Sequence, residues 1–276
     1  MSIELEIQDG SPHWWNSSDV WVVPGNDPSG SPGQPIAGQT AYLWGRVHNN
    51  GSTFANSAQV NFYWSNPATG VLRSNSTFIG ASFVDLDPGE TQEVLCLTPW
   101  MPTIVNDGHE CIVAEVIHVA DPLPSPLPDA FDPPAYLQIA QRNLSVLSMK
   151  TSMMILPIEL AASPREKKSL EVMLEFGEEI DRKSIRQLGM GKIEYTKKPI
   201  VKAELTMDRG CGKINTKHCC CHLRVDLAPG TSQAVYLKVD PCNLKPGVYI
   251  PINVIAREGD KIVGGITFIV IRSEEE

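Results

Sequence analysis

The sequence lacks a run of about 18 apolar residues, which a helix needs to cross a bilayer, so it predicts no membrane span. Basic residues are also scarce, because 23 Lys and Arg stand against 32 Asp and Glu, and the formal net charge is −9. A chain this acidic repels phosphate backbones and anionic lipid surfaces. We therefore expect no nucleic-acid partner.

The N-terminus lacks the pattern of a secretory leader. Residues 1–10 are acidic and alternating, without the basic start and apolar stretch of a signal peptide. We expect a cytoplasmic protein, or one exported by a route that reads no leader. No catalytic motif stands out, and the sequence therefore predicts no enzyme and no catalytic residue.

What the sequence does contain is a strand–turn–strand pattern that occurs twice. Residues 40–64 alternate on both sides of an Asn-Asn-Gly turn, and residues 223–239 alternate on both sides of a Pro-Gly turn. Alternation with period two buries one face of a strand and exposes the other. The chain has 276 residues, 21 Gly and 22 Pro. This length suits two domains, and many short strands need many turns.

The fold class predicted is all-β, with two tandem immunoglobulin-like antiparallel β-sandwiches over residues 1–148 and 149–276. In the first domain we expect strands at 3–7, 20–23, 40–48, 58–64, 77–84, 91–97, 110–118 and 137–147. In the second we expect strands at 170–176, 199–206, 222–227, 233–239, 248–256 and 261–272. Residues 178–188 predict one short helix, because acidic residues lie at its N-terminal end and Gly189 follows it as a stop. The proline-rich residues 121–134 predict a stiff surface loop on the first sandwich.

The first 148 residues resemble the bacterial cell-adhesion-related immunoglobulin-like domains. The stretches that carry the resemblance are 37–43, 47–51, 60–63, 86–91, 98–100 and 139–143. The resemblance implies a seven-stranded sandwich with a binding, spacer or adhesive role, and it supplies no catalytic residues. Residues 108–113 depart from the family pattern before the sixth strand. The second half resembles an immunoglobulin-like domain only loosely, through residues 244–252 and 264–271.

Cysteine and histidine gather between residues 211 and 222. Soft thiolates and imidazoles suit tetrahedral Zn²⁺, so a zinc site is one hypothesis. The candidate ligands are Cys211, His218, Cys219, Cys221, His222 and Cys242. The spacing matches no standard zinc knuckle, and neighbouring cysteines on a strand point to opposite faces. A disulfide within the cluster and plain thiols remain open alternatives. Cys96 and Cys111 lie in apolar strand patterns and are predicted to be buried thiols.

All six tryptophans lie in the first domain, and Trp14 and Trp15 are adjacent in a polar loop. Exposed tandem tryptophans could stack on sugar rings or anchor a protein. The alternative is that both indoles plug one end of the sandwich.

The sequence as a whole indicates a bacterial, non-enzymatic binding or structural module that contacts a protein or surface ligand through sandwich loops and strand edges. Three alternatives remain open at this stage. They are a carbohydrate-binding module using Trp14 and Trp15, a subunit of a larger tail or secretion assembly (or a homo-oligomer), and a zinc- or thiol-dependent protein centred on residues 211–222.

Overall fold

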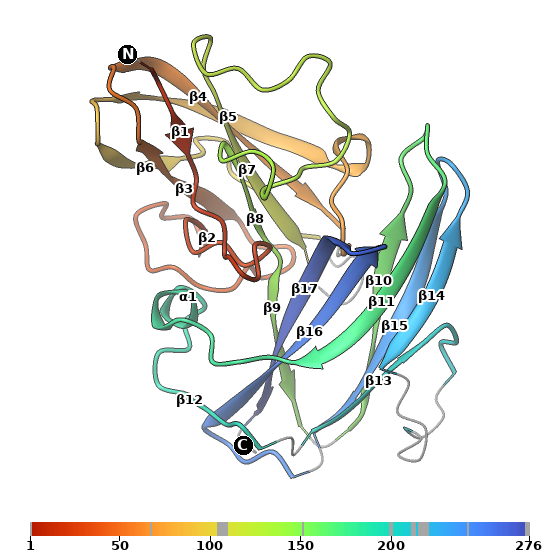
Figure 1. Ribbon diagram of the computed structural model, residues 1–276. Helices are drawn as coiled ribbons and strands as arrows, with labels where there is room; N and C mark the ends of the chain where they lie inside the picture. Colours follow the sequence, from red (N-terminus) through yellow and green to blue (C-terminus); the bar gives the residue numbers. More distant parts are fainter. Residues whose placement is uncertain are drawn as a thin grey trace. The chain divides into compact units, whose positions relative to one another are not determined.

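The computed structural model describes residues 2–66, 68–103, 110–150, 152–198, 201–210, 214, 221–241 and 243–273, and it is built almost entirely of β-strands (Figure 1). This confirms the predicted all-β sandwich class. The chain divides into two compact units. Unit 1 holds Met1–Ser65, Val71–Asn143 and Arg186–Gly189, and unit 2 holds Asn66–Gly70, Leu144–Ile185 and Met190–Glu276.

Unit 1 consists of two four-stranded sheets. In the first sheet β3 pairs with β1, β2 and β6, and in the second the strand order is β5-β4-β7-β8. The strands of the first sheet are β1 (Leu5–Glu6), β2 (Val20–Pro24), β3 (Ala41–Asn49) and β6 (Thr91–Leu95). Those of the second are β4 (Ala55–Ser65), β5 (Thr77–Leu86), β7 (Cys111–Ile117) and β8 (Ile139–Arg142), and the short 3-10 helix η1 spans Arg73–Asn75. All pairings in these two sheets are antiparallel.

The core of unit 1 follows from the alternation in its strands. Along β3 every second residue is buried, from Ala41 to Asn49, and Leu43 and Val47 join the main cluster of the unit. Phe62 from β4 is fully buried in the same cluster. Burying each such aliphatic or aromatic side chain contributes about 1.5–3 kcal/mol. The inward half of the alternating pattern is therefore what holds the two sheets together.

The proline-rich segment covers part of the outer face of the second sheet, where it runs as a long yellow-green loop (Figure 1). Phe131 is buried against a small satellite cluster that includes Val113 and Cys111 of β7. The guanidinium of Arg73 lies 4.1 Å from the centre of the Phe131 ring and forms an ion pair with the buried Glu115. The predicted surface loop is thus fastened to the sheet at Phe131.

Unit 2 also consists of two sheets. One has the strand order β10-β15-β13, and the other has the order β14-β11-β16-β17-β9 with β12 added alongside β16. Their bounds are β9 (Leu144–Met149), β10 (Met154–Ala161), β11 (Lys168–Phe176), β12 (Glu194–Tyr195), β13 (Lys202–Thr206), β14 (His222–Leu227), β15 (Ser232–Asp240), β16 (Val248–Glu258) and β17 (Lys261–Arg272). The short helix α1 (Arg182–Gln187) follows β11 in the chain.

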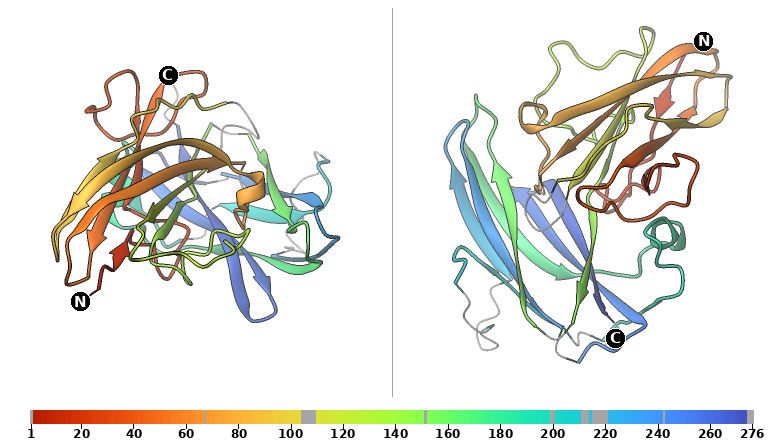
Figure 2. Two further views of the ribbon diagram at one scale, coloured as in Figure 1. Left: turned by 90° about the horizontal axis from the view of Figure 1, so that it is seen from above. Right: turned by 180° about the vertical axis from the view of Figure 1, so that it is seen from behind.

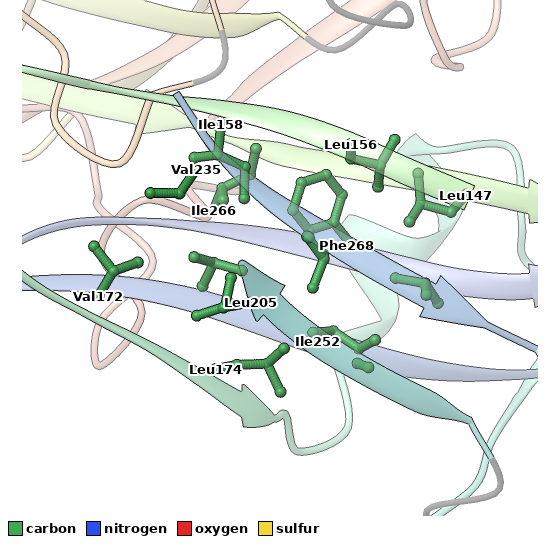
Figure 3. Close-up of a cluster of buried hydrophobic side chains, with 14 of the residues drawn as sticks. Leu147, Leu156, Ile158, Val172, Leu174, Leu205, Val235, Ile252, Ile266 and Phe268 are labelled. Carbon is green, nitrogen blue, oxygen red and sulfur yellow. The ribbon is translucent and has the colours of Figure 1, made fainter. Parts of the chain in front are cut away.

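Aliphatic side chains from both sheets meet in the core of unit 2. Figure 3 shows Leu156 and Ile158 of β10 and Val235 of β15 close to Ile266 and Phe268 of β17. Phe268 is fully buried. The predicted inward face of residues 170–176 is correct up to Leu174, whereas Phe176 is exposed. This face of β11 therefore ends at Leu174.

Two expectations about strand pairing need correction. Residues 137–147 are not one closing strand, because the chain breaks at Asn143 into β8, which pairs with β7, and β9, which pairs with β17. The β9–β17 and β12–β16 pairs are parallel, so the second sandwich is not purely antiparallel. Alternation reports which face of a strand is buried and carries no information on its pairing partner or direction, which explains both errors.

The strand β10 was not predicted, because Pro157 lies in its middle. A proline removes a ladder donor and argues against a central strand, but it is tolerated at a sheet edge. Since β10 pairs with β15 and ends the order of its sheet, Pro157 occupies such an edge. The helix is shorter than predicted. Asp181 comes just before α1, and its carboxylate accepts a hydrogen bond from the Ser184 N–H in the first turn. Gly189, at φ +74°, follows the helix as a glycine stop.

Candidate functional site

Trp14 and Trp15 are both buried. Their exposed fractions are 6% and 0%, and the two rings meet edge to face with their centres 5.6 Å apart. The backbone of Trp15 is held as well, since its carbonyl accepts a hydrogen bond of 2.7 Å from the Asn143 N–H. A sugar-stacking platform needs exposed ring faces. The hypothesis of an exposed tandem-tryptophan site is therefore corrected: in this structure both indoles are buried against each other.

Most of the predicted zinc ligands lie outside the described residues, namely Cys211, His218, Cys219 and Cys242. The two that are described lie at the start of β14, where Cys221 is exposed and His222 forms an ion pair with Glu171 of β11. Within the described ranges, no three His, Cys, Asp or Glu side chains converge as a metal site would require. The zinc hypothesis stays a prediction about residues 211–222 and Cys242.

Cys96 and Cys111 are buried, as predicted. Burial raises the pKa of the Cys96 thiol, which lies 3.6 Å from the carbonyl of Thr98. Because the thiolate is the reactive form, a raised pKa makes a thiol less reactive. Cys96 therefore acts as a small core residue.

A charged cluster that the sequence analysis did not single out lies on the outer face of the first sheet. The buried carboxylate of Asp19 binds Arg46 at 2.7 Å and His48 at 2.8 Å, both from β3. The other ring nitrogen of His48 lies 2.8 Å from the Thr91 hydroxyl. Trp21 stacks beside Trp44 and faces the Arg46 guanidinium at 5.3 Å. Alternation along β3 places Trp44, Arg46 and His48 on the same face of the strand. This pattern is the feature of the sequence from which the cluster could have been predicted. The cluster fastens the start of β2 to β3 and β6.

The most exposed apolar side chains of unit 1 include three that lie along one border of the second sheet. Phe78 and Phe83 of β5 are 54% and 66% exposed, and Leu97, just after β6, is 73% exposed. Among the described strands β5 pairs with β4 alone, so its opposite edge is open. Figure 2 shows β5, in gold, as the outer strand of the curled β4–β5 pair. We call Thr77–Val84 together with residues 96–98 the β5 rim.

Close packing holds the two parts of the β5 rim together. A Cβ atom on Gly80 would lie 2.5 Å from the Thr98 hydroxyl and 3.1 Å from the Cys96 sulfur, so only glycine fits there. Leu97, between those two residues, is thereby held beside β5. The Phe78 ring lies 5.5 Å from the Tyr63 ring, which lies 5.2 Å from Phe131. An apolar row therefore runs from the proline-rich loop to the rim.

The β5 rim carries no charge. Residues 74–84 and 94–106 contain no Asp, Glu, Lys or Arg, although the chain as a whole has a net charge of −9. Natural edge strands are commonly protected against pairing by lysine, proline or a bulge. On β5 the protection is limited to two register irregularities, one opposite Phe62 and Tyr63 and one opposite Ala55 and Ala58. The rim is thus an open hydrogen-bonding edge with exposed aromatic side chains, which is how a strand-addition site is built.

None of the known protein families matches this sequence, and no curated protein matches it. Solved structures do show likenesses. A CARDB domain of the PF1109 protein of Pyrococcus furiosus, solved in complex with di-metal ions, has a TM-score of 0.30 and 17% identity, covering 51% of this chain and 90% of that domain. A solution structure of that domain gives a TM-score of 0.28 and 20% identity, covering 45% of this chain and 90% of that one.

Red sea bream transglutaminase gives a TM-score of 0.24 and 11% identity, covering 93% of this chain and 32% of the transglutaminase. The two CARDB structures belong to the class of immunoglobulin-like domain that residues 1–148 resemble. At these scores the likeness is loose, and we base no conclusion about function on it. Within the described residues, no helix is long and apolar enough to cross a membrane.

Proposed function

We propose that this chain is a non-enzymatic binding or structural module that contacts a protein or a surface ligand through the strand edges and loops of its sandwiches. The observation that carries the proposal is the β5 rim, an open strand edge with Phe78, Phe83 and Leu97 exposed beside it. Exposed apolar side chains gathered along an unpaired edge are typical of an interaction surface.

The carbohydrate-binding alternative loses its main support, because the indoles on which it depends are buried. The zinc alternative rests on residues outside the described part and is tested by metal analysis of protein purified without chelator. A subunit of a larger assembly needs a surface for a neighbouring subunit. The β5 rim supplies one, so that alternative becomes a special case of the proposal.

The proposal is tested with three baits: the wild-type chain, Phe83→Asp and the control Phe176→Asp. Phe83 lies on the β5 rim, whereas Phe176 is an exposed phenylalanine at the end of β11 in unit 2. Proteins from the native host that are retained by wild type and Phe176→Asp but lost on Phe83→Asp are purified and titrated against all three. Rim-dependent binding supports the proposal. If no purified protein distinguishes Phe83→Asp from the control, the proposal is wrong.

A further inference from the structure

We infer that the β5 rim pairs with the β5 rim of a second copy of this chain, so that two copies join edge to edge. The inference rests on the proposed function and names the contact that the rim makes. Two copies each carrying a net charge of −9 repel one another over most of their surfaces. The repulsion is smallest where charge is absent, and the uncharged residues 74–84 and 94–106 both contribute to the rim.

Pairing a strand with its own copy is antiparallel about a two-fold axis, so the residue on the axis meets its own counterpart and residues at equal distances on either side of it meet each other. Placing the axis at Phe83 sets the most exposed large hydrophobic residue of β5 directly against itself. Cross-strand aromatic pairs of this kind stabilise antiparallel sheets. In the same register Asp85 lies opposite Ala81, so the two Asp85 carboxylates do not face each other. The Asp85 carboxylate has a partner within its own copy, because it accepts a hydrogen bond of 2.7 Å from the Ser57 N–H.

The pairing would continue the second sheet of unit 1 across the axis in the order β8-β7-β4-β5-β5-β4-β7-β8. Sheets of this width are common in proteins. The pairing also gives hydrogen-bond partners to the edge of β5 that no other strand of the described residues pairs with. A contact of one strand edge per copy is small, so we expect a dimer that dissociates on dilution rather than a permanent one.

The test is sedimentation velocity of the full chain over a range of concentrations, with Phe83→Asp, Phe83→Lys and an equal mixture of the two. Wild type should approach the mass of two chains as concentration rises. Each variant alone should dimerise at least about tenfold more weakly, because like charges would stand directly opposite each other. The mixture should regain the dimer, because aspartate would then face lysine. This recovery also excludes unfolding as the cause of the loss.

Phe176→Asp and Phe176→Lys provide the matched control, since they make the same changes at an exposed phenylalanine of β11 that is not part of the rim, and both should dimerise like wild type. A wild-type chain that stays monomeric at every concentration overturns the inference. So does a dimer that survives Phe83→Asp, or a mixture that fails to recover. In those cases the proposed function is still decided separately, by rim-dependent binding of a different protein.

Discussion

Asn49 holds the turn between β3 and β4 with its side chain. Its amide nitrogen donates to the carbonyls of Thr53, Leu86 and Asp87 at 2.9–3.3 Å, and its amide oxygen accepts from the Gly51 N–H at 3.1 Å. Asn49 is fully buried, so these bonds are not replaced by water when the side chain is lost. We predict that Asn49→Ala lowers the free energy of unfolding by about 1–3 kcal/mol, measured by urea denaturation.

Asn50→Ala is the matched control, because Asn50 is the neighbouring asparagine and is exposed. Its side chain donates to the carboxylate of the half-buried Glu6 in an exposed contact. A change within about 0.5 kcal/mol is expected for Asn50→Ala. Equal losses for the two variants would show that the buried hydrogen bonds of Asn49 do not matter more than the exposed contact.

Glu110 titrates at an unusual pH. Burial raises the pKa of this carboxyl to about 7, and a hydrogen bond of 2.9 Å from the Thr103 N–H opposes the rise. The folded state therefore holds its proton more tightly than the unfolded state, whose pKa is near 4.5. The stability linked to Glu110 is complete below pH 4.5 and is lost as pH rises through about 7.

Glu110→Gln stays neutral and should therefore gain stability over wild type as pH rises from 4.5 to 7. Allowing for screening by solvent, we expect a gain of about 1 kcal/mol at neutral to alkaline pH and little difference at pH 4. Thermal or urea unfolding of both proteins across this range measures it. A difference that does not vary with pH would contradict the assigned pKa.

Sequence reasoning succeeded for those residues whose role follows from strand alternation. It identified Cys96 and Cys111 as buried because both lie within apolar strand runs. It could not decide between the exposed and buried alternatives for Trp14 and Trp15, because they lie in a loop without periodicity. The burial of Asn49 could not be predicted either, since an asparagine in a turn usually faces water.

The proline-rich loop is an element whose place depends on a few contacts. Phe131 packs on Tyr63 and under Arg73, and Arg73 also donates to the carbonyl of Pro128 at 3.0 Å. Removing the ring removes the apolar anchor of the loop while the sandwich core stays intact. We predict that Phe131→Ala speeds amide hydrogen exchange across residues 121–134 and leaves β3 unchanged. Leu127→Ala, a change at an exposed residue of the same loop, should leave exchange near the wild-type rate.

Most strands could be predicted from alternation, and their ends lie within a few residues of the expected ones. The exceptions have physical causes. The strand β10 was not predicted because it contains Pro157, and the two-residue strand β12 is too short to show a period. The β5 rim shows the same limit: the strand at 77–84 was predicted, but its open edge follows only from the pairing of the sheet. Which strand lies at an edge is set by contacts between distant segments.

At the level of the whole molecule, net charge should govern how tightly two copies bind. The formal charge of −9 opposes association over a distance of about one Debye length, while the rim itself is uncharged. Added salt screens the repulsion without weakening the apolar contact. We predict that the dissociation constant of the wild-type dimer falls as sodium chloride is raised from low to physiological strength, measured by sedimentation. A constant that rises with salt would instead indicate attraction between opposite charges.

The claim that the β5 rim is the contact surface is tested most directly by hydrogen exchange of the wild-type chain at low and high protein concentration. Amides of residues 77–84 should exchange more slowly at high concentration, because pairing protects an edge strand. Residues 202–206 of β13, which form a sheet edge in unit 2, should exchange at the same rate at both concentrations. Exchange in β5 that is independent of concentration, or protection that appears at β13 instead, would contradict the account.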